Sequence, residues 1–300
     1  MEESVAARRL NRIMRHLHSF PSTSGSSVIE EQSGGCFEVV PTSASDGIEG
    51  QNEEASKPGD RERVILVIGA GDATGGAVAK KFASEGYTAC LVRRDASKLE
   101  QLAQDITQNG GKAHVFGVDA RKEEQVVALV EQIEKDIGDI RVLVFNIGAN
   151  VNFSILETTS RVYRKVWEMA CFAGFLCGRE VAKRMVVRGN GTVFFTGATA
   201  SLRGGSGYAA FAGAKFGLRA LAQSMARELG PKGIHVAHLI VDGPIDTQWT
   251  RGQVKDSASI LERQGMVNPQ DIAKLYWYTY QQPKTAWTHE LDLRPWIETW

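Results

Sequence analysis

Short runs of aliphatic and β-branched residues recur along the chain from residue 63 onward, and segments with helical spacing separate them. The runs cover residues 64–68, 88–92, 114–118, 142–147, 192–195 and 235–241. Most of each run is apolar without alternation, which is typical of a parallel strand that is buried on both faces. The pattern therefore predicts parallel strands that alternate with helices.

Two of the intervening segments have a clear apolar face. One face consists of Val126, Val130, Ile133 and Ile137, and the other of Leu218, Leu221, Ala222, Met225 and Leu229. The second segment runs into Gly230-Pro231, a typical helix stop signal. This alternation predicts an α/β fold of the doubly wound, Rossmann type, with a parallel sheet of about seven strands and helices on both faces. In such folds, ligands bind beyond the carboxyl ends of the strands.

The first 62 residues have a different composition. They contain six Lys or Arg and eleven Asp or Glu, a net charge of −5, while the whole chain of 300 residues has a net charge of 0. Residues 21–56 contain eight Ser, seven acids and no Lys or Arg. Such a segment buries too little apolar surface to offset the entropy cost of ordering it. We therefore expect an N-terminal extension over 1–62 with a disordered tether, and a single domain over 63–300.

A short basic amphipathic helix is predicted at the start of this extension. Its apolar face consists of Leu10, Ile13, Met14 and Leu17, and the arginines nearby lie mostly off that face. Two interpretations stay open. Residues 1–20 resemble a mitochondrial targeting segment in being amphipathic and Arg-rich, although Glu2 and Glu3 count against this because such segments are poor in acids. The other interpretation is a tail that docks on a partner or on nothing.

Composition excludes several classes of protein. The balanced charge argues against nucleic acid as the main partner. No apolar run approaches the roughly 18 to 20 residues that cross a bilayer, and nothing near the first residue is typical of a secretory signal. We therefore expect no transmembrane segment and a cytoplasmic protein. The four cysteines and six histidines show no metal-binding spacing, so we expect reduced thiols and no metal.

A glycine-rich turn follows the first predicted strand. Gly69, Gly71 and Gly75 precede an apolar helical segment. A turn of this kind lets backbone N–H groups and a helix N-terminus approach a pyrophosphate closely. Asp72 within the turn works against a phosphate. The position after the first strand of an alternating series predicts a dinucleotide-binding site.

The second predicted strand ends in Arg93-Arg94-Asp95. An acid that ends this strand would bind the adenosine ribose hydroxyls, whereas arginine there favours the extra 2′-phosphate of NADP. Because the acid comes after two cations, the sequence favours NADP(H) over NAD(H) as cofactor. A solvated charged turn is the alternative.

With the glycine turn and the predicted strands in this order, residues 63–300 resemble the short-chain dehydrogenase/reductase family over nearly their whole length. The glycine turn is similar to the family's GxxxGxG with Ala73 at the middle glycine, and Asp119-Ala120 is similar to its Asp-Val step, whose carboxylate contacts the adenine. Residues 145–148 stand where the family has Asn-Asn-Ala-Gly. Residues 241–247 resemble its Pro-Gly-x-Ile-x-Thr loop beside the nicotinamide. Together these patterns assign cofactor contacts to Gly69, Gly71, Gly75, Arg93, Arg94, Asp119, Asn146, Gly148, Lys215, Gly243, Ile245 and Thr247.

The sequence departs from the family in the groups that transfer protons. The resemblance implies a Tyr-xxx-Lys pair, a serine thirteen residues before the tyrosine, and an asparagine on the preceding helix. Lys215 is present, but Phe211, Ala198 and Cys171 occupy the other three positions. Phenylalanine has no exchangeable proton, and positioned acid–base catalysis contributes typically about 10² to 10⁴-fold. The chain is therefore identified as a divergent member that lacks most of the catalytic tetrad.

Other groups could supply the proton. Tyr208 would lie on the same side of a helix as Phe211, displaced by roughly 4.5 Å along the axis. Thr199 and Ser201 flank Ala198, but we expect them to bond local backbone. Asp242 and Asp246 are candidate bases, although loop acids are more often solvated. Two functions stay open: an NADP(H)-dependent oxidoreductase with an atypical donor for a carbonyl or alcohol substrate, or a nucleotide-binding scaffold or redox-responsive regulator without turnover.

Aromatic residues are concentrated near the end of the chain. Five of the six tryptophans lie after residue 248, together with three tyrosines over 276–280. The resemblance places the substrate lid and part of the subunit interface here, and it implies a homo-oligomer, a dimer or a tetramer. We expect these aromatics to form a buried interface or core in preference to an aromatic substrate site.

Overall fold

The structure is a computed structural model that describes residues 61–299 of the chain. The basic amphipathic segment and most of the tether predicted over 1–62 lie outside the described residues. The first strand of the described part begins at Glu62, one residue before the predicted start of the domain.

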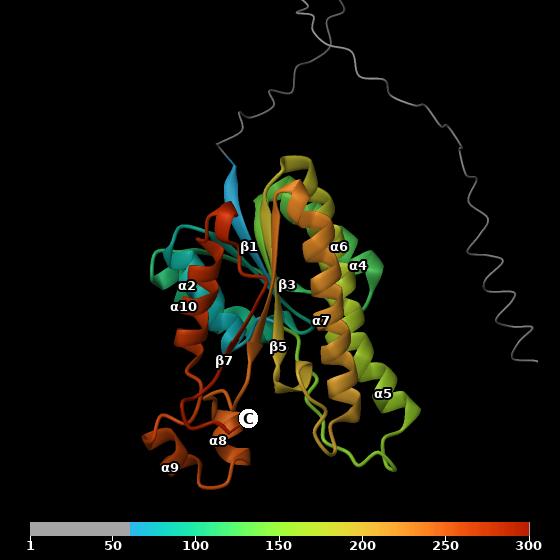
Figure 1. Ribbon diagram of the computed structural model, residues 1–300. Helices are drawn as coiled ribbons and strands as arrows, with labels where there is room; N and C mark the ends of the chain where they lie inside the picture. The colour runs from blue at the N-terminus through green and yellow to red at the C-terminus, as the bar shows by residue number, and fades with distance from the viewer. Residues whose placement is uncertain (1–60, 300) are drawn as a thin grey trace, which may run out of the picture. The chain divides into compact units, whose positions relative to one another are not determined.

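A seven-stranded sheet forms the centre of the domain (Figure 1). The strands are β1 (Glu62–Ile68), β2 (Thr88–Arg93), β3 (Lys112–Gly117), β4 (Gly138–Phe145), β5 (Gly191–Ala198), β6 (Ile234–Val241) and β7 (Glu290–Leu293). Their order is β3-β2-β1-β4-β5-β6-β7, and every neighbouring pair is parallel. The chain changes direction across the sheet between β1 and β4, so a crevice forms beyond the carboxyl ends of these two strands. The predicted doubly wound parallel sheet is confirmed.

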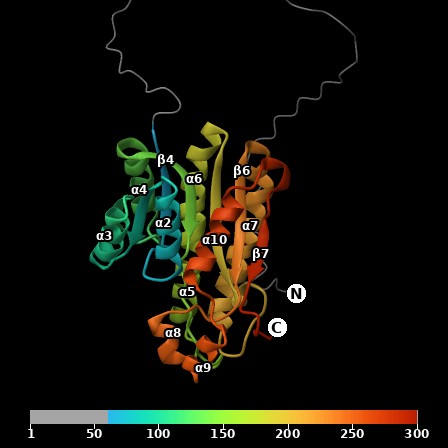
Figure 2. The same ribbon diagram turned by 90° about the vertical axis from the view of Figure 1, so that its left-hand side faces the viewer.

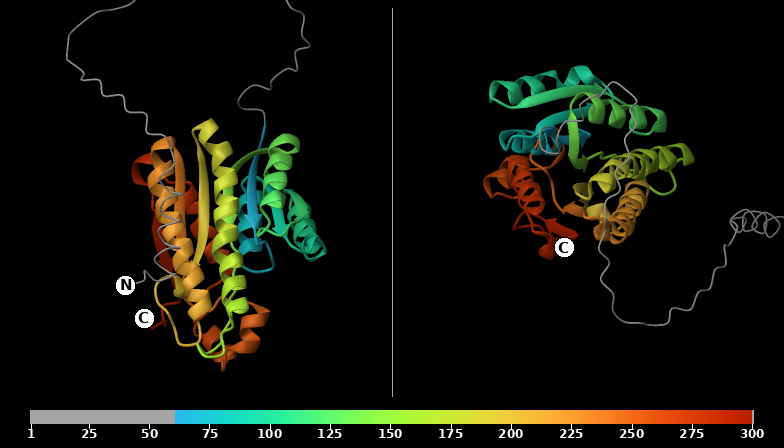
Figure 3. Two further views of the ribbon diagram at one scale, coloured as in Figure 1. Left: turned by 90° about the vertical axis from the view of Figure 1, so that its right-hand side faces the viewer. Right: turned by 90° about the horizontal axis from the view of Figure 1, so that it is seen from above.

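Helices cover both faces of the sheet, as predicted. One layer consists of α2 (Thr74–Ser84), α3 (Glu100–Gln108) and α10 (Pro269–Tyr280), which Figure 2 shows in front of the strands. The opposite layer consists of α4 (Glu123–Asp136), α6 (Ala173–Arg188) and α7 (Ala209–Leu229), in front in the left view of Figure 3. The remaining helices are α5 (Ser160–Trp167), α8 (Gln248–Gln253) and α9 (Ser257–Glu262), a π-helical turn η2 (Glu168–Phe172), and the 3₁₀ turns η1 (Ala96–Leu99), η3 (Thr199–Ser201), η4 (Gly230–Lys232) and η5 (Lys284–Ala286).

Two apolar cores lie between the sheet and its helix layers. The apolar helical faces predicted over 126–137 and 218–229 both belong to the core between the sheet and the α4, α6 and α7 layer. Of the residues in these two faces, Ile137, Leu221 and Met225 are only partly buried. The second core joins the other face of the sheet to α2, α3 and α10. Strands that are buried on both faces explain the uninterrupted apolar runs in the sequence.

The C-terminal aromatic residues divide into two groups. Trp277 and Tyr280 on α10 pack against Phe82 on α2, with ring centroids 5.0 and 5.5 Å apart. These rings belong to the core between two helices, as the sequence predicted. Trp249 and Trp296 are instead 66% and 76% exposed.

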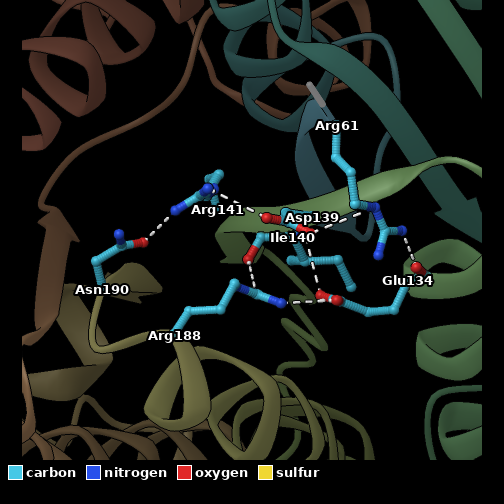
Figure 4. Close-up of polar contacts among 7 residues, drawn as sticks. All are labelled: Arg61, Glu134, Asp139, Ile140, Arg141, Arg188 and Asn190. Atoms are coloured by element: carbon cyan, nitrogen blue, oxygen red, sulfur yellow. Dashed lines mark hydrogen bonds and ion pairs between the residues drawn. The ribbon is translucent and has the colours of Figure 1, made fainter. Parts of the chain in front are cut away.

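A polar network holds the amino ends of β1 and β4 (Figure 4). Its members are Arg61, Glu134, Asp139, Ile140, Arg141, Arg188 and Asn190. Arg188 donates to Glu134 Oε2 over 2.7 Å and to the carbonyl oxygen of Ile140 over 2.8 Å. The other oxygen of Glu134 accepts the Ile140 N–H over 3.0 Å. The network therefore connects the C-terminal ends of α4 and α6 to the sheet at the amino ends of the strands.

Within residues 61–299, no helix is long and apolar enough to cross a membrane. The cysteines of this part of the chain, Cys90, Cys171 and Cys177, are free and buried.

Candidate functional site

A cleft of about 1200 Å³ opens at the carboxyl ends of the strands. The segments that follow β1 to β6 all contribute to its walls, and α8 extends beside it at the lower end of Figure 1. The predicted site residues that line the cleft are Gly69, Gly71, Gly75, Arg93, Arg94, Asp119, Asn146, Gly148, Tyr208, Lys215, Gly243 and Ile245. Residues from distant parts of the sequence thus meet where the fold predicts a ligand.

The glycine turn after β1 leaves no room for side chains. Gly69 has a φ of +87°, and a Cβ there would lie 2.8 Å from the carbonyl oxygen of Asn146. A Cβ on Gly75 would lie 2.6 Å from the carbonyl oxygen of Gly69. The Asn146 side chain also donates to this oxygen over 3.2 Å. The turn is therefore held against the end of β4, and glycine is required at both positions.

The start of α2 faces the cleft with its backbone donors available. No side chain caps the helix at Ala73, and its first turn contains no acid. The Thr74 hydroxyl is buried and has no hydrogen-bond partner within the described part of the chain. Uncapped N–H groups, the positive end of the helix dipole and a hydroxyl without a partner fit an anion such as a pyrophosphate.

Cations outnumber acids where β2 and β3 end. The cations that line the cleft here are Arg93, Arg94, Lys98 and Arg121, and the acids are Asp95 and Asp119. Arg121 donates to both oxygens of the Asp119 carboxylate, over 2.8 and 2.6 Å, and these bonds hold the pKa of Asp119 below its usual range. The carboxylate that the resemblance assigns to adenine is therefore already engaged. The surplus of positive charge fits an additional phosphate on the cofactor.

Lys215 lies in the floor of the cleft, almost fully buried. Its ammonium group donates to the carbonyl oxygens of Thr196 and Ile147 over 2.8 and 3.2 Å. Burial lowers the pKa of Lys215 to about 8, because a charged amine loses its hydration there. The two carbonyls hold the ammonium group at the ends of β5 and β4.

The structure shows where the three substituted positions lie. Phe211 and Ala198 line the cleft, and Phe211 is only 8% exposed. Cys171 is not among the cleft residues, because its thiol packs against α7, where a Cβ on Gly217 would lie 2.9 Å from the sulfur. Burial raises the pKa of this thiol. A phenyl ring and a methyl group therefore occupy the wall where the resemblance implies a phenol and a hydroxyl.

The hydroxyl groups that could replace the missing proton donor differ in their contacts. Tyr208 directly precedes α7 and lines the cleft. Ser201 is fully buried and accepts the Ala198 N–H over 3.2 Å, so it bonds local backbone as expected. Thr199 bonds instead to a side chain, because its hydroxyl donates to Asp242 over 2.6 Å.

The two candidate bases differ in exposure. Asp242 is fully buried behind the cleft wall. Asp246 accepts two hydrogen bonds from Arg251, over 2.6 and 2.9 Å. The expectation of a solvated loop acid is wrong for Asp242, whereas Asp246 keeps 17% of its side chain exposed beside Arg251.

Thr247 is the one predicted cofactor contact that does not line the main cleft. Its hydroxyl accepts the Thr250 N–H over 3.0 Å and thereby caps α8. It lines a smaller hollow that shares Asp72, Ala73 and Trp249 with the cleft.

Several residues that line the cleft were not predicted from the sequence: Thr74, Lys98, Arg121, Arg203 and Trp249. Thr74 could have been found as the hydroxyl residue within the glycine turn, directly before Gly75. Nothing in the sequence around Arg121 or Arg203 indicates a place in the cleft, because their positions depend on contacts made in the fold. No group of three or more His, Cys, Asp or Glu within residues 61–299 could hold a metal ion.

The sequence of the domain matches a known family. Residues 63–258 match the model of the short chain dehydrogenases. The chain belongs to this family. A short-chain dehydrogenase/reductase of Armillaria gallica is 30% identical over 196 residues, which cover 64% of this chain and 75% of that protein.

Solved structures agree with this assignment. A short-chain dehydrogenase from Rhodopseudomonas palustris is 52% identical and has a TM-score of 0.68, over 79% of this chain and all of that chain. A metagenomic short-chain oxidoreductase in complex with NADP has a TM-score of 0.68 at 23% identity, over 79% of this chain and 99% of that one. The second similarity shows the fold alone.

Proposed function

We propose that the protein is an NADP(H)-dependent oxidoreductase that acts on a carbonyl or an alcohol and uses Tyr208 as its proton donor and acceptor. One observation carries this proposal: among residues 61–299, Tyr208 is the only tyrosine that lines the cleft. It lies three residues before Phe211, at the start of the helix that carries Lys215. A phenol is thus available beside the position where the family's own is missing.

Different residues of the cleft bind different parts of the cofactor. The glycine turn and the start of α2 bind the pyrophosphate, and Arg93 and Arg94 bind the phosphate on the adenosine ribose. Asn146 and Lys215 line the cleft at the ends of the central strands, where the nicotinamide half belongs. The bound dinucleotide supplies or accepts a hydride. The preference for NADP(H) rests on the arginines after β2.

The chain's own contribution to the chemistry is the proton. In reduction, the Tyr208 hydroxyl donates its proton to the substrate oxygen as the carbonyl carbon gains the hydride. The phenolate then regains a proton from solvent through the open cleft. Lys215 favours this phenolate electrostatically, because an amine with a pKa of about 8 is mostly charged at neutral pH. Phe211 excludes water without taking part in the proton transfer.

A second function has its own support. A binding protein without turnover, either a scaffold or a redox-responsive regulator, is favoured by the side chains at 171, 198 and 211. None of the three provides the acid–base group that the family uses there. Cofactor contacts would then be kept for binding alone.

The two functions are separated by one series of measurements. A thermal shift with NADPH and with NADH tests binding, because a ligand of the native state raises the melting temperature. NADPH oxidation with a panel of carbonyl compounds then tests turnover. We expect Tyr208→Phe to lower the rate at least about tenfold. Tyr278→Phe, at an exposed tyrosine of α10, is the matched control and should have no effect.

Binding without turnover across the panel would contradict the oxidoreductase. If adding both Phe211→Tyr and Ala198→Ser then gave no activity, the scaffold would be favoured. A wild-type rate that survives Tyr208→Phe would contradict the assignment of the donor alone.

We also propose that the protein forms a homo-oligomer, a dimer or a tetramer. Tyr163, Trp167, Phe175 and Phe216 on the outer helices are between 37% and 45% exposed, and exposed aromatic clusters favour association. Light scattering tests this, and Trp167→Lys should lower the mass; a monomeric wild type would contradict it. The cytoplasmic location, and the alternative of mitochondrial targeting through residues 1–20, stay predictions.

A further inference from the structure

A carboxylate is buried behind the cleft wall at the loop that follows β6. Asp242 has no exposed surface, although burying a carboxylate is costly unless cations and hydrogen bonds compensate it. One of its oxygens accepts a 2.6 Å hydrogen bond from the Thr199 hydroxyl. The resemblance places a proline at this position, so the acid is a feature of this chain that the cofactor contacts do not explain.

Two guanidinium groups share this carboxylate. Arg294 approaches it to 3.4 Å and also pairs with Asp292. Arg203 donates to both oxygens of Asp242 over 3.4 and 3.5 Å, which is long for a hydrogen bond. A guanidinium has five N–H donors in a planar fork, so these two long bonds leave Arg203 with donors for another acceptor.

Of the two arginines that share Asp242, Arg203 is the one that lines the cleft. It lies in the connection from β5 to α7, between Ala198 and Tyr208, and its side chain is 43% exposed. The acids that line the cleft are Asp72, Asp95 and Asp119. Asp72, Asp95 and Asp119 follow β1, β2 and β3 in turn, at the end of the cleft where we propose that the cofactor binds. The wall beside Arg203 therefore presents positive charge without a competing acid on the cleft surface.

We propose that Arg203 binds a carboxylate group of the substrate, so that the substrates are oxo acids or the matching hydroxy acids. This inference rests on the proposed function, because it concerns the substrate of the same cleft. Asp242 is a positioning residue: it holds the guanidinium at the wall through two parallel contacts and leaves the outer edge of the fork for the ligand. Trp249 and Phe211 line the same cleft and give the substrate an apolar surface beside this charge.

The test compares acids with their neutral forms. Protein saturated with NADP⁺, which cannot reduce an oxo acid, is titrated calorimetrically with a series of oxo acids of increasing chain length, each paired with its methyl ester. We expect at least one acid to bind about tenfold more tightly than its ester, because a charge-assisted bond is lost in the ester. Arg203→Gln should remove this ratio while NADPH affinity stays the same, and Arg203→Lys should restore part of it. Arg184→Gln, on the outside of α6, is the matched control.

Two outcomes would overturn the inference. One is that no acid binds better than its ester to the wild type, and the other is that the ratio persists in Arg203→Gln. The titrations are also run without cofactor. A failure of NADPH to bind would contradict the proposed function, whereas the acid-to-ester ratio of the protein alone would still decide the role of Arg203.

Discussion

The ammonium nitrogen of Lys215 lies 5.8 Å from the centre of the Phe211 ring. The two residues are one helical turn apart on α7, so they face the cleft together. A cation over the face of an aromatic ring is attracted to its π electrons, which offsets part of the cost of burying the charge. The lysine is thus accommodated without the phenol that accompanies it elsewhere in the family. The charge of Lys215 therefore lies beside a ring that has no exchangeable proton.

The first prediction concerns the phenol and the hydroxyl that positions 211 and 198 lack. Adding Phe211→Tyr together with Ala198→Ser should raise the rate of NADPH oxidation by about 10² or more, because a phenol and a hydroxyl would then line the wall beside Lys215. Steady-state absorbance measures the rate. Phe211→Leu with Ala198→Ser is the matched control and should give no gain. An equal gain in both double variants would show that the phenol is not responsible.

The titration of Lys215 gives a second prediction. Its pKa is about 8 in the folded protein and 10.5 by its ordinary value. Between these values the unfolded chain holds a proton that the folded chain has released, so the stability should rise with pH in this window. We expect the free energy of unfolding of the wild type to rise relative to Lys215→Met by up to about 3 kcal/mol.

Urea unfolding at several pH values between 8 and 10.5 measures this difference. Lys183→Met, at an exposed lysine of α6, is the control for the general effect of losing a lysine. A constant difference between the wild type and Lys215→Met across the window would mean that burial does not lower the pKa of this amine.

The arginines after β2 give a third prediction. Arg93→Ala should weaken NADPH binding about tenfold and NADH binding much less, because only NADPH carries the additional phosphate. Fluorescence titration of both cofactors measures the two affinities. Arg227→Ala, near the far end of α7, is the matched control. Equal losses for both cofactors would remove the preference for NADP(H).

The glycine turn gives a fourth prediction. Gly75→Ala should abolish NADPH binding and cost about 1–3 kcal/mol of stability, because the new methyl group would lie 2.6 Å from the Gly69 carbonyl oxygen. Thermal unfolding with and without NADPH measures both effects. Gly230→Ala, where the added methyl group meets no atom within 4 Å, is the matched control. Unchanged binding in Gly75→Ala would mean that the turn tolerates a side chain.

The fold could be predicted where burial leaves a continuous apolar run. Five of the six predicted strands, β1, β2, β4, β5 and β6, lie inside the sheet and are found near their predicted places for this reason. The sixth, β3, is an edge strand that is only partly buried, and the run over 114–118 still overlaps it. The seventh, β7, reads Glu-Leu-Asp-Leu and lies at the edge of the sheet, half-buried. An edge strand of four residues with two acids leaves no such run, so its position could not be located from the sequence.

The site was predictable wherever a motif directly follows a strand. The glycine turn and Arg93 are such cases, since strand ends meet at one edge of the sheet. Contacts between distant segments could not be predicted. The pairing of Asp242 with Arg203 joins residues 39 positions apart, and nothing in either local sequence indicates it. That the Thr247 hydroxyl caps α8 could not be predicted either, because the apolar pattern does not reveal this helix.

The central claim is that a nicotinamide dinucleotide binds in the cleft against the glycine turn. Titration of the protein with NADPH, followed by the change in cofactor fluorescence, tests it most directly. We expect saturable binding that Gly75→Ala abolishes and Gly230→Ala preserves. No saturable binding to the wild type at millimolar NADPH and NADH would contradict both proposed functions.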